Sequence, residues 1–518
     1  MTRRVPLYIL LPSLVAALCM VLPLVYLALR ALQADPATVQ SLVLRPRNLT
    51  LLGNTLSLVL GVLVISTALS LPLAWIVTRT RIRYKRLLTV LGVVPLAVPG
   101  YVMAYALMGL GGHYGVLAQL FGWKLPNIEG YWGATLALSL YTFPYLFLNL
   151  RATLLGLDAS LEESARSLGY GPGQIFRRVI LVQLAPSLMA GWLVIGLYVL
   201  GDFGAVSLMR YEAFSYAIFN QYAGAFDRIY AAWLSLMLLA VAAAFVMTES
   251  LVLRRRRLAS VGRGVARPPP PSELGLWRWP AYLYMGCVFT AAIGLPVMIL
   301  GYWLLMAPPD LSFFLDVPAT FARSAAAAAP AAMLAVAAAL PMAYYSVRYR
   351  SGLSSMVERS AYVGYAIPPL TLALALVFFA LQAAPFLYQT LTLLIFGWTL
   401  ATLALALGPV RSALMQARPN MEEAAHSLGH GPVSTFFHVI FPGLRRSLFA
   451  SFALVFLFCM KELPITFLLA PTGYTTLAVT VFSRTSEGMM AEAAPFAAAI
   501  VIFSGLSVGM VLQREGNR

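Results

Sequence analysis

Two polar stretches in an otherwise apolar chain place carboxylates, a glycine and a proline at the same spacing. The first reads EESARSLGYGP from Glu162 to Pro172, and the second reads EEAAHSLGHGP from Glu422 to Pro432, 260 positions later. When the alignment is extended to 26 positions, 13 of them are identical. A repeat of this quality indicates an internal duplication, so whatever chemistry the stretches carry, the chain carries it twice.

The spacing at the start of each stretch is that of a capped helix. Ser160 precedes Glu163 by three residues, and Asn420 precedes Glu423 by three, as an N-cap residue and its N3 glutamate do in a capping box. Side chains in such a box accept hydrogen bonds from the first turn and reach back to the cap. The pattern therefore predicts that a helix begins at each of these points.

A glycine and a proline predict where each short helix ends and the next begins. Gly169 and Gly429 stand where a left-handed residue would close the helix. Pro172 and Pro432 follow at a position suited to the first turn of a second helix. Each stretch is thus predicted to be a two-turn helix, a glycine break and another helix, outside the membrane. Because the two copies occupy equivalent places, we interpret them as docking elements for two copies of one soluble partner rather than as plain connectors.

The residue patterns of common catalytic and metal sites are missing from the sequence. It has no G-x-x-x-x-G-K-[ST] loop to hold ATP phosphates, no H-E-x-x-H pair and no recognisable Ser/His/Asp arrangement. His426 and His430 are four residues apart, but Gly429 lies between them, and the first copy has Arg166 and Tyr170 at those places. The three cysteines fall inside apolar runs. The sequence therefore indicates a conduit and not an enzyme, and it identifies no metal site.

The elements that must position these stretches are membrane-spanning helices. The 518 residues are 60% hydrophobic and 11% charged, whereas water-soluble proteins carry about 25% charged residues. Apolar runs of about 20 residues are long enough to cross a bilayer as helices. We predict an all-α polytopic membrane protein with about twelve transmembrane helices. Their approximate ranges are 7–30, 51–78, 87–111, 131–152, 187–204, 229–252, 279–305, 321–347, 358–381, 386–410, 447–468 and 493–513.

Positive charge predicts the orientation of the chain and the boundary between two halves. Most Lys and Arg residues lie in segments that would face the cytoplasm if the amino terminus does, so the net charge of +17 reflects topology and not a nucleic-acid-binding patch. The basic, proline-rich segment at 254–278 cannot enter a bilayer or form a helix interior. We predict two parallel six-helix repeats at 1–253 and 279–518, with the polar stretches at 160–182 and 420–442 and with both termini cytoplasmic.

Shorter repeats of sequence support the duplication. LPLA at 71–74 matches LPMA at 340–343, and VPG at 98–100 matches IPP at 367–369, both 269 positions apart. The change from this offset to 260 fits a longer outer loop in the first half, around 111–129.

Two acidic residues lie at equivalent places near the outer ends of the predicted fifth helices. Asp202 and Glu462 are 260 positions apart, and a carboxylate at membrane depth costs roughly 2.5–3.5 kcal/mol and usually faces the bundle interior or water. One interpretation is a polar lining for a cation path, to which Tyr198, Phe203 and Lys461 would also belong. The other is structural: Asp202 caps the outer loop, and Glu462 pairs with Lys461 or with a helix end. The sequence leaves both open.

The second polar stretch resembles the EAA loop of binding-protein-dependent ABC importer permeases, whose pattern is E-A-A, three residues, a glycine, nine residues and I-x-L-P. The first stretch has Glu163, Ser164, Ala165, Gly169 and Val179 at the corresponding places, but Leu181-Val182 replaces the final Leu-Pro. The resemblance implies that each loop fits into a cleft on an ATP-binding subunit and conveys its closure to the pore. The residues implied in ATPase docking are Glu162, Glu163, Ala165, Gly169, Glu422, Glu423, Ala424, Ala425, Gly429 and Pro442.

Two halves fused in one chain resemble the permeases of ferric-iron importers, and also those for thiamine. Segment 197–228 looks most like the ferric-iron group, and its counterpart in the second half is 458–488. The resemblance implies a type I ABC importer permease fold in a bacterial inner (plasma) membrane. It also implies two copies of an ATPase subunit at the cytoplasmic face and a soluble substrate-binding protein at the outer face. The partner subunits would use ATP, and this chain would bind no cofactor.

Two alternatives to a ferric-iron permease remain at this point. Thiamine is the second expected substrate, ahead of polyamines, sulfate and phosphonates. The alternative class is an ion-driven secondary transporter, which can also have twelve helices in two parallel repeats.

Overall fold

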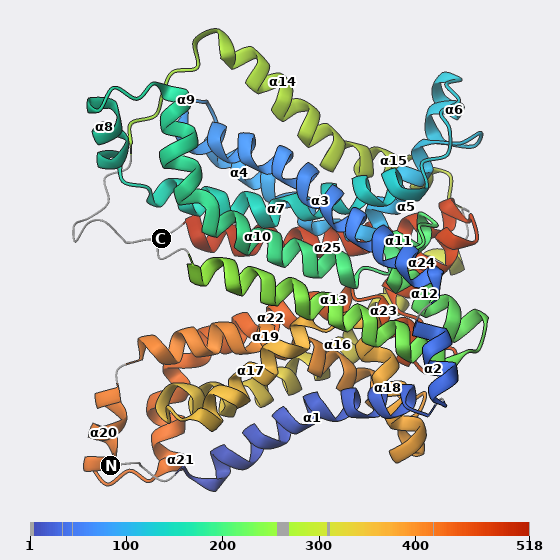
Figure 1. Ribbon diagram of the computed structural model, residues 1–518, viewed down its shortest axis with the longest axis vertical. Coiled ribbons are helices and arrows are strands. Elements are labelled where there is room, and N and C mark those ends of the chain that lie inside the picture. The colour runs from blue at the N-terminus through green and yellow to red at the C-terminus, as the bar shows by residue number, and fades with distance from the viewer. Residues whose placement is uncertain are drawn as a thin grey trace. The chain divides into compact units, whose positions relative to one another are not determined.

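The computed structural model describes residues 5–33, 35–43, 45–255, 269–307, 311–417 and 419–516, and these are mostly helical (Figure 1). Ten of the described helices are long and apolar enough to cross a membrane, or up to twelve spans if each of two bent helix pairs counts as one. The prediction of an all-α polytopic protein is therefore confirmed. Most of the basic run of the predicted linker, 256–268, lies outside the described residues, as do residues 1–4.

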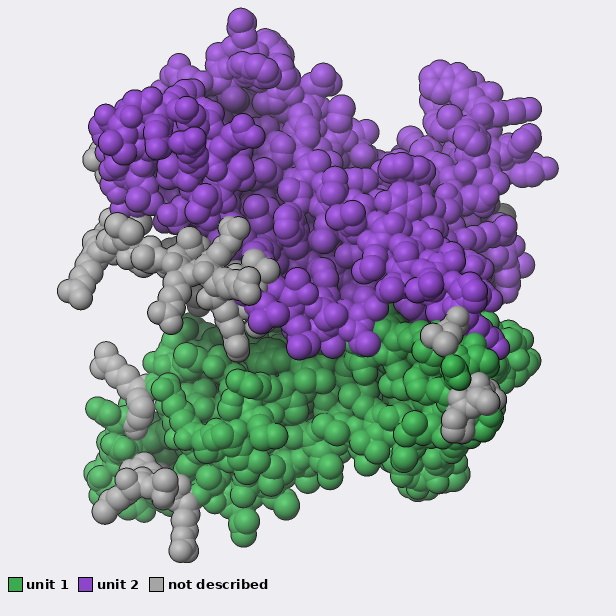
Figure 2. Space-filling model, in the orientation of Figure 1, with its two compact units in different colours: residues 1–44, 218–239, 311–480 green, residues 45–217, 240–310, 481–518 purple. Residues whose placement is uncertain are grey.

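One compact unit, unit 1, comprises residues 1–44, 218–239 and 311–480 (Figure 2). Its helices are α1 (Leu7–Ala31), α2 (Pro36–Val43), η3 (Asn220–Gly224), α16 (Leu311–Arg348), α17 (Gly352–Ala366), α18 (Pro369–Ala383), η6 (Pro385–Leu387), α19 (Leu391–Gln416), α20 (Pro419–Ser427), α21 (Pro432–Thr435), η7 (Phe436–Ile440), α22 (Phe441–Met460) and α23 (Pro464–Leu469). In this unit α16 packs against α19 and α22, and α1 packs against α16, α17 and α18.

The other compact unit, unit 2, comprises residues 45–217, 240–310 and 481–518. Its helices are α3 (Pro46–Arg79), α4 (Lys85–Val93), η1 (Val94–Ala97), α5 (Gly100–Leu110), α6 (Val116–Phe121), α7 (Gly130–Gly156), α8 (Ala159–Ser167), α9 (Pro172–Ile175), η2 (Phe176–Ile180), α10 (Leu181–Gly201), α11 (Gly204–Leu208), η4 (Gly275–Trp277), α14 (Arg278–Phe289), η5 (Thr290–Gly294), α15 (Leu295–Leu305) and α25 (Met490–Gly516). Here α3, α7 and α10 pack together, and α15 packs against α5 and α25. The helices α12 (Phe214–Phe219), α13 (Arg228–Arg255) and α24 (Leu477–Ser486) contribute residues to both units.

Neither unit is a continuous half of the chain. α1 opens the chain but packs in unit 1, whose other long helices come from residues 311–460. α15 follows the predicted linker but packs in unit 2, against α5 and α25. The division of the sequence at 254–278 stays a prediction about the repeats, because the packing does not follow the linear order of the chain.

The predicted third and ninth helices are each broken in the middle, which corrects the expectation of one continuous helix at 87–111 and at 358–381. The segment 85–97 meets α5 at an angle of 91°, and α17 meets α18 at 108°. The breaks fall at Pro99 and Pro368, within the repeated VPG and IPP triplets. A proline disfavours helical backbone in the residue before it, and Val98 and Ile367 are accordingly extended, with ψ of 99° and 124°.

The predicted fifth and eleventh helices begin too late in the sequence-based assignment. The structure has one continuous helical span over Pro172–Gly201 and another over Pro432–Met460, where starts at 187 and 447 were predicted. A prediction based on apolar runs leaves out the first turns of these spans, because they contain polar residues such as Arg177 and Arg178. Each span contains a turn of π-helix at the same place, η2 and η7. Such turns accommodate one extra residue in an α-helix.

Candidate functional site

The two polar stretches form short helices, α8 and α20, but their first residues differ from those predicted. Asp158 is the N-cap of α8, with its Oδ1 accepting from the Ser160 backbone nitrogen at 3.1 Å. Asn420 lies inside α20, which begins at Pro419. The predicted N-cap roles of Ser160 and Asn420 are therefore wrong. An aspartate two residues earlier is itself a strong cap, and a proline favours the first helical position.

The glycine breaks are confirmed in both copies. Gly169 has φ of 81° and Gly429 has φ of 84°, which is the left-handed region that ends many helices. The next backbone nitrogen in each copy donates back to a buried alanine: Tyr170 to the Ala165 carbonyl at 3.1 Å, and His430 to Ala425 at 3.0 Å. No atom lies within 4 Å of a Cβ added at either glycine. The requirement for glycine is therefore one of backbone conformation and not of space.

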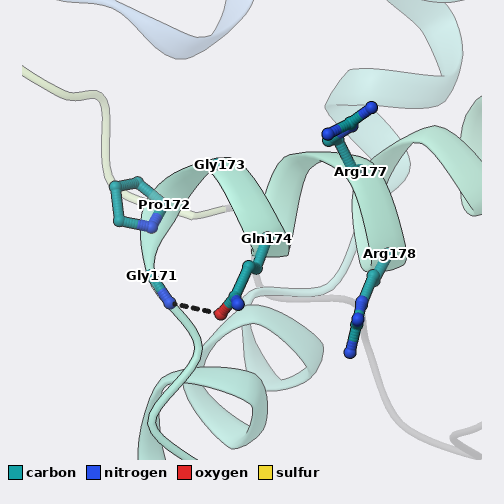
Figure 3. A pocket seen from close by; sticks show the side chains of 6 residues that line it. All are labelled: Gly171, Pro172, Gly173, Gln174, Arg177 and Arg178. Carbon is teal, nitrogen blue, oxygen red and sulfur yellow. Dashed lines mark hydrogen bonds between the residues drawn. The ribbon is translucent and has the colours of Figure 1, made fainter.

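The second helix of each element begins at its proline, as predicted. Pro172 and Pro432 occupy the first position of α9 and α21. In the first copy the Gly171 nitrogen donates to Gln174 Oε1 at 3.2 Å, and these residues line a hollow of about 700 Å³ (Figure 3). Pro172, Gly173, Arg177 and Arg178 complete the lining. The hollow therefore lies at the point where the first polar element enters the helical span over Pro172–Gly201.

Each short helix presents a similar surface to solvent. Glu163 and Glu423 are exposed, and Leu168 and Leu428 expose 75% and 80% of their surface. The apolar residues in the turn before each glycine are therefore uncovered in the isolated chain. The remaining predicted docking residues divide by burial: Ala165 and Ala425 are buried, whereas Gly169, Ala424, Gly429 and Pro442 are exposed.

The first glutamate of each stretch points inward instead. Glu162 Oε1 lies 2.9 Å from Arg79 Nη1, and Glu422 Oε1 lies 2.6 Å from Arg348 Nη2. The four side chains expose only 6–14% of their surface. Neither arginine was predicted from the sequence as a partner of these glutamates. The sequence feature that could have identified the two arginines is their equivalent position in the repeats: they are 269 residues apart, and each follows the LPLA or LPMA motif.

The two carboxylates predicted near the outer helix ends both cap short helices. Asp202 Oδ1 accepts from the Ala205 and Val206 nitrogens at 2.9 and 3.2 Å, at the start of α11. Glu462 accepts from the Ile465 nitrogen at 2.7 Å and the Thr466 nitrogen at 3.0 Å, at the start of α23. These contacts agree with the structural alternative from the sequence, in which Asp202 is a cap and Glu462 interacts with a helix end.

Other side chains enclose these caps. Glu462 also accepts from Trp398 Nε1 at 2.9 Å, and the fully buried Phe203 contacts Phe482. Tyr198 packs its ring against Tyr141. Among the described residues, no group of three or more His, Cys, Asp or Glu could hold a metal ion. The path role of Asp202, Phe203, Tyr198, Lys461 and Glu462 stays a prediction.

A pair of substitutions separates the capping and path roles. We expect Asp202→Asn to retain substrate uptake, because asparagine is also a good N-cap. Asp202→Ala should lower the free energy of unfolding by about 1–2 kcal/mol, because alanine cannot cap the helix. Uptake in proteoliposomes and thermal unfolding in detergent check this. If Asp202→Asn folds normally but loses uptake, the carboxylate charge serves the path.

The described residues thus form a polytopic helical protein with ten to twelve candidate membrane spans and two matched polar helical elements. The family described as "binding-protein-dependent transport system inner membrane component" matches residues 70–257 and 331–514. The chain belongs to this family, and it is therefore a multi-pass inner membrane permease of a binding-protein-dependent ABC importer. Membership implies an ATPase and a binding protein as partners.

The relatives differ in how much of this chain they match. The Fe(3+)-transport system permease protein FbpB 2 of Haemophilus influenzae is 33% identical over 98% of both chains. The molybdenum transport system permease protein ModB of Escherichia coli is 32% identical over 26% of this chain and 58% of its own. A probable sulfate transport system permease protein of Prototheca wickerhamii is 29% identical over 30% of this chain and 62% of its own.

Proposed function

We propose that this permease moves ferric iron, delivered by a soluble binding protein at the outer face, into the cytoplasm. The observation that carries the proposal is the similarity to the ferric-iron permease of Haemophilus influenzae, which extends over 98% of both chains. The sulfate and molybdenum permeases match only 30% and 26% of this chain. Since the described residues hold no evident metal-ligand cluster, the substrate assignment rests on that relative and not on a ligand set.

The proposal includes the mode of coupling to ATP. Two ATPase subunits dock on α8 and α20 at the cytoplasmic face, where both chain termini also lie, and their closure drives alternating access. The exposed Glu163, Leu168, Glu423 and Leu428 support this role, because they give each element a charged and an apolar contact at equivalent places. The closed ATPase pair must contact the two access states differently, since equal binding to both would shift neither.

ATP hydrolysis in proteoliposomes tests the substrate and the class together. The chain is reconstituted with its co-purified ATPase and given ferric-loaded binding protein, empty binding protein or thiamine-loaded binding protein. We expect stimulation by the ferric-loaded form alone. Stimulation by the thiamine-loaded form instead would support an ABC importer but contradict ferric iron as its substrate. If no ATPase co-purifies, the docking role is contradicted.

A further inference from the structure

The two inward-pointing glutamates join each docking helix to a second membrane span. Arg79 is the last residue of α3 and Arg348 is the last residue of α16. Their partners, Glu162 and Glu422, stand immediately before the glutamates that match the EAA pattern. Both pairs therefore connect the same two places in each repeat, the docking helix and the end of the long helix that carries the LPLA or LPMA motif.

The second pair is held by several directional contacts. Arg348 donates from Nε and Nη2 to Glu422 Oε1 at 3.0 and 2.6 Å, and Nη2 also approaches the Ala417 carbonyl at 3.3 Å. The Tyr344 hydroxyl donates to Glu422 Oε2 at 2.7 Å. Charge-assisted contacts from a planar guanidinium fix direction as well as distance. The carboxylate of α20 is thus bound to α16 by two of its side chains, one turn apart.

The first pair joins the equivalent places through one contact, 2.9 Å between Arg79 Nη1 and Glu162 Oε1, and has different neighbours. The Arg79 guanidinium lies 5.7 Å from the centre of the Trp75 ring, and Trp75 occupies the place of Tyr344, 269 residues earlier. Trp75 also contacts Phe176, the first residue of the π-helical turn η2. On the other side, the Ser272 nitrogen donates to the Arg79 carbonyl at 2.8 Å. An aromatic residue one turn before a buried arginine is therefore common to both copies.

Each docking helix is joined covalently to its own unit at both ends, to α7 or α19 before it and through the glycine turn to the long helices α9–α10 or α21–α22 after it. The ion pair adds a third attachment, to α3 or α16. Since α3 packs against α10, and α16 packs against α22, a displacement of the docking helix acts on two spans that already contact each other.

We propose that Arg79 and Arg348 are positioning residues that couple ATPase closure to the transmembrane helices through Glu162 and Glu422. The inference rests on the proposed docking role of α8 and α20. It assigns to the ion pairs the transfer of movement and not the binding of the ATPase. Substituting one partner alone should strongly reduce the iron transported per ATP, because the remaining partner is then a buried, uncompensated charge.

The test uses the complex of permease, ATPase and binding protein in proteoliposomes, with ferric-loaded binding protein and internal ATP. Glu422→Gln and Arg348→Gln are each expected to keep the bound ATPase and its hydrolysis but to lower the iron transported per ATP by about tenfold. The double variant should be no worse than either single one, because both substitutions remove the same interaction. Arg348→Lys, which retains the charge without the fork of donors, should recover part of the loss.

A matched control removes another ion pair in the same unit. Glu358 Oε1 lies 2.9 Å from Arg411 Nε, and this pair joins α17 to α19 without contacting Glu422. Glu358→Gln should leave the iron transported per ATP unchanged. Hydrogen exchange of the purified permease gives a second readout, in which Glu422→Gln speeds exchange in α20 but not in α19.

The outcomes distinguish this inference from the function on which it rests. If the wild-type chain binds no ATPase, the docking proposal itself fails. If the ATPase binds and Glu422→Gln changes neither the transport ratio nor exchange in α20, the coupling role of the ion pair is wrong. Loss of ATPase binding in Glu422→Gln with unchanged exchange in α20 would also overturn it, because the glutamate would then contact the partner directly.

Discussion

Proline in place of Gly429 is expected to reduce uptake at least about 100-fold while the bound ATPase continues to hydrolyse ATP. Gly429 has φ of 84°, whereas the proline ring holds φ near −65°. The turn that sends the chain from α20 into α21 would therefore have to change direction. The His430 to Ala425 hydrogen bond that closes this turn would be lost with it. Iron uptake and ATP hydrolysis are measured on the same proteoliposomes, and their ratio gives the iron transported per ATP hydrolysed.

Two neighbouring substitutions control for a general disturbance of this element. Gly429→Asn should keep most of the uptake, because asparagine adopts left-handed backbone at low cost. Gly431→Ala should also be tolerated, since Gly431 has φ of −68° and no atom lies within 4 Å of an added Cβ. Uptake at the wild-type rate by a correctly inserted Gly429→Pro variant would contradict a role for this turn in coupling.

The combined substitution Glu163→Lys and Glu423→Lys is expected to weaken binding of the ATPase subunits at least about 100-fold, because each change replaces a favourable charged contact with a like-charge one. Both side chains are exposed. Glu163 lies beyond the first turn of α8, whose acidic residue there is Glu162, so the helix dipole adds little to its effect. The loss should therefore appear in the complex and not in the stability of the permease. Binding of purified ATPase to immobilised permease measures it.

Glu273→Lys provides the same change of charge at another exposed place. Glu273 pairs with Arg81 at 2.9 Å, with 76% of its side chain exposed, and exposed pairs of this kind contribute about 1 kcal/mol or less. We expect this variant to bind the ATPase as the wild type does. Equal binding by the Glu163→Lys and Glu423→Lys double variant would reject α8 and α20 as the docking surface.

The sequence predicted the local features that depend on a single residue type. Gly169 and Gly429 require left-handed backbone, and Pro172 and Pro432 favour a helix start, so their neighbours in sequence were enough to place them. The breaks in the third and ninth helices could also have been predicted from the sequence. The repeated triplets at 98–100 and 367–369 contain the prolines that end each first segment, but an assignment based on apolar length treats a proline inside a long run as tolerated.

Contacts between distant residues could not be predicted in the same way. Arg79 and Glu162 lie 83 positions apart, and nothing in either local pattern shows that one faces the other. The caps of α11 and α23 were harder still, since a carboxylate near the outer end of a helix fits a cation path and a cap equally well. The capping contacts became evident only from the directions of the Ala205, Val206, Ile465 and Thr466 nitrogens in the folded chain.

The exchange of helices between the linear halves affects how the chain can be divided. A fragment ending at residue 255 would keep α5 without α15 and α25, which pack against it, and α1 without α16, α17 and α18. The complementary fragment would lack α1, which packs against α16, α17 and α18, and α5, which packs against α15. Each fragment alone would leave apolar helix faces uncovered, so neither half is a self-sufficient folding unit. Biosynthesis as one polypeptide thus ensures that the two halves are always made in equal amounts and that each meets the helices it needs.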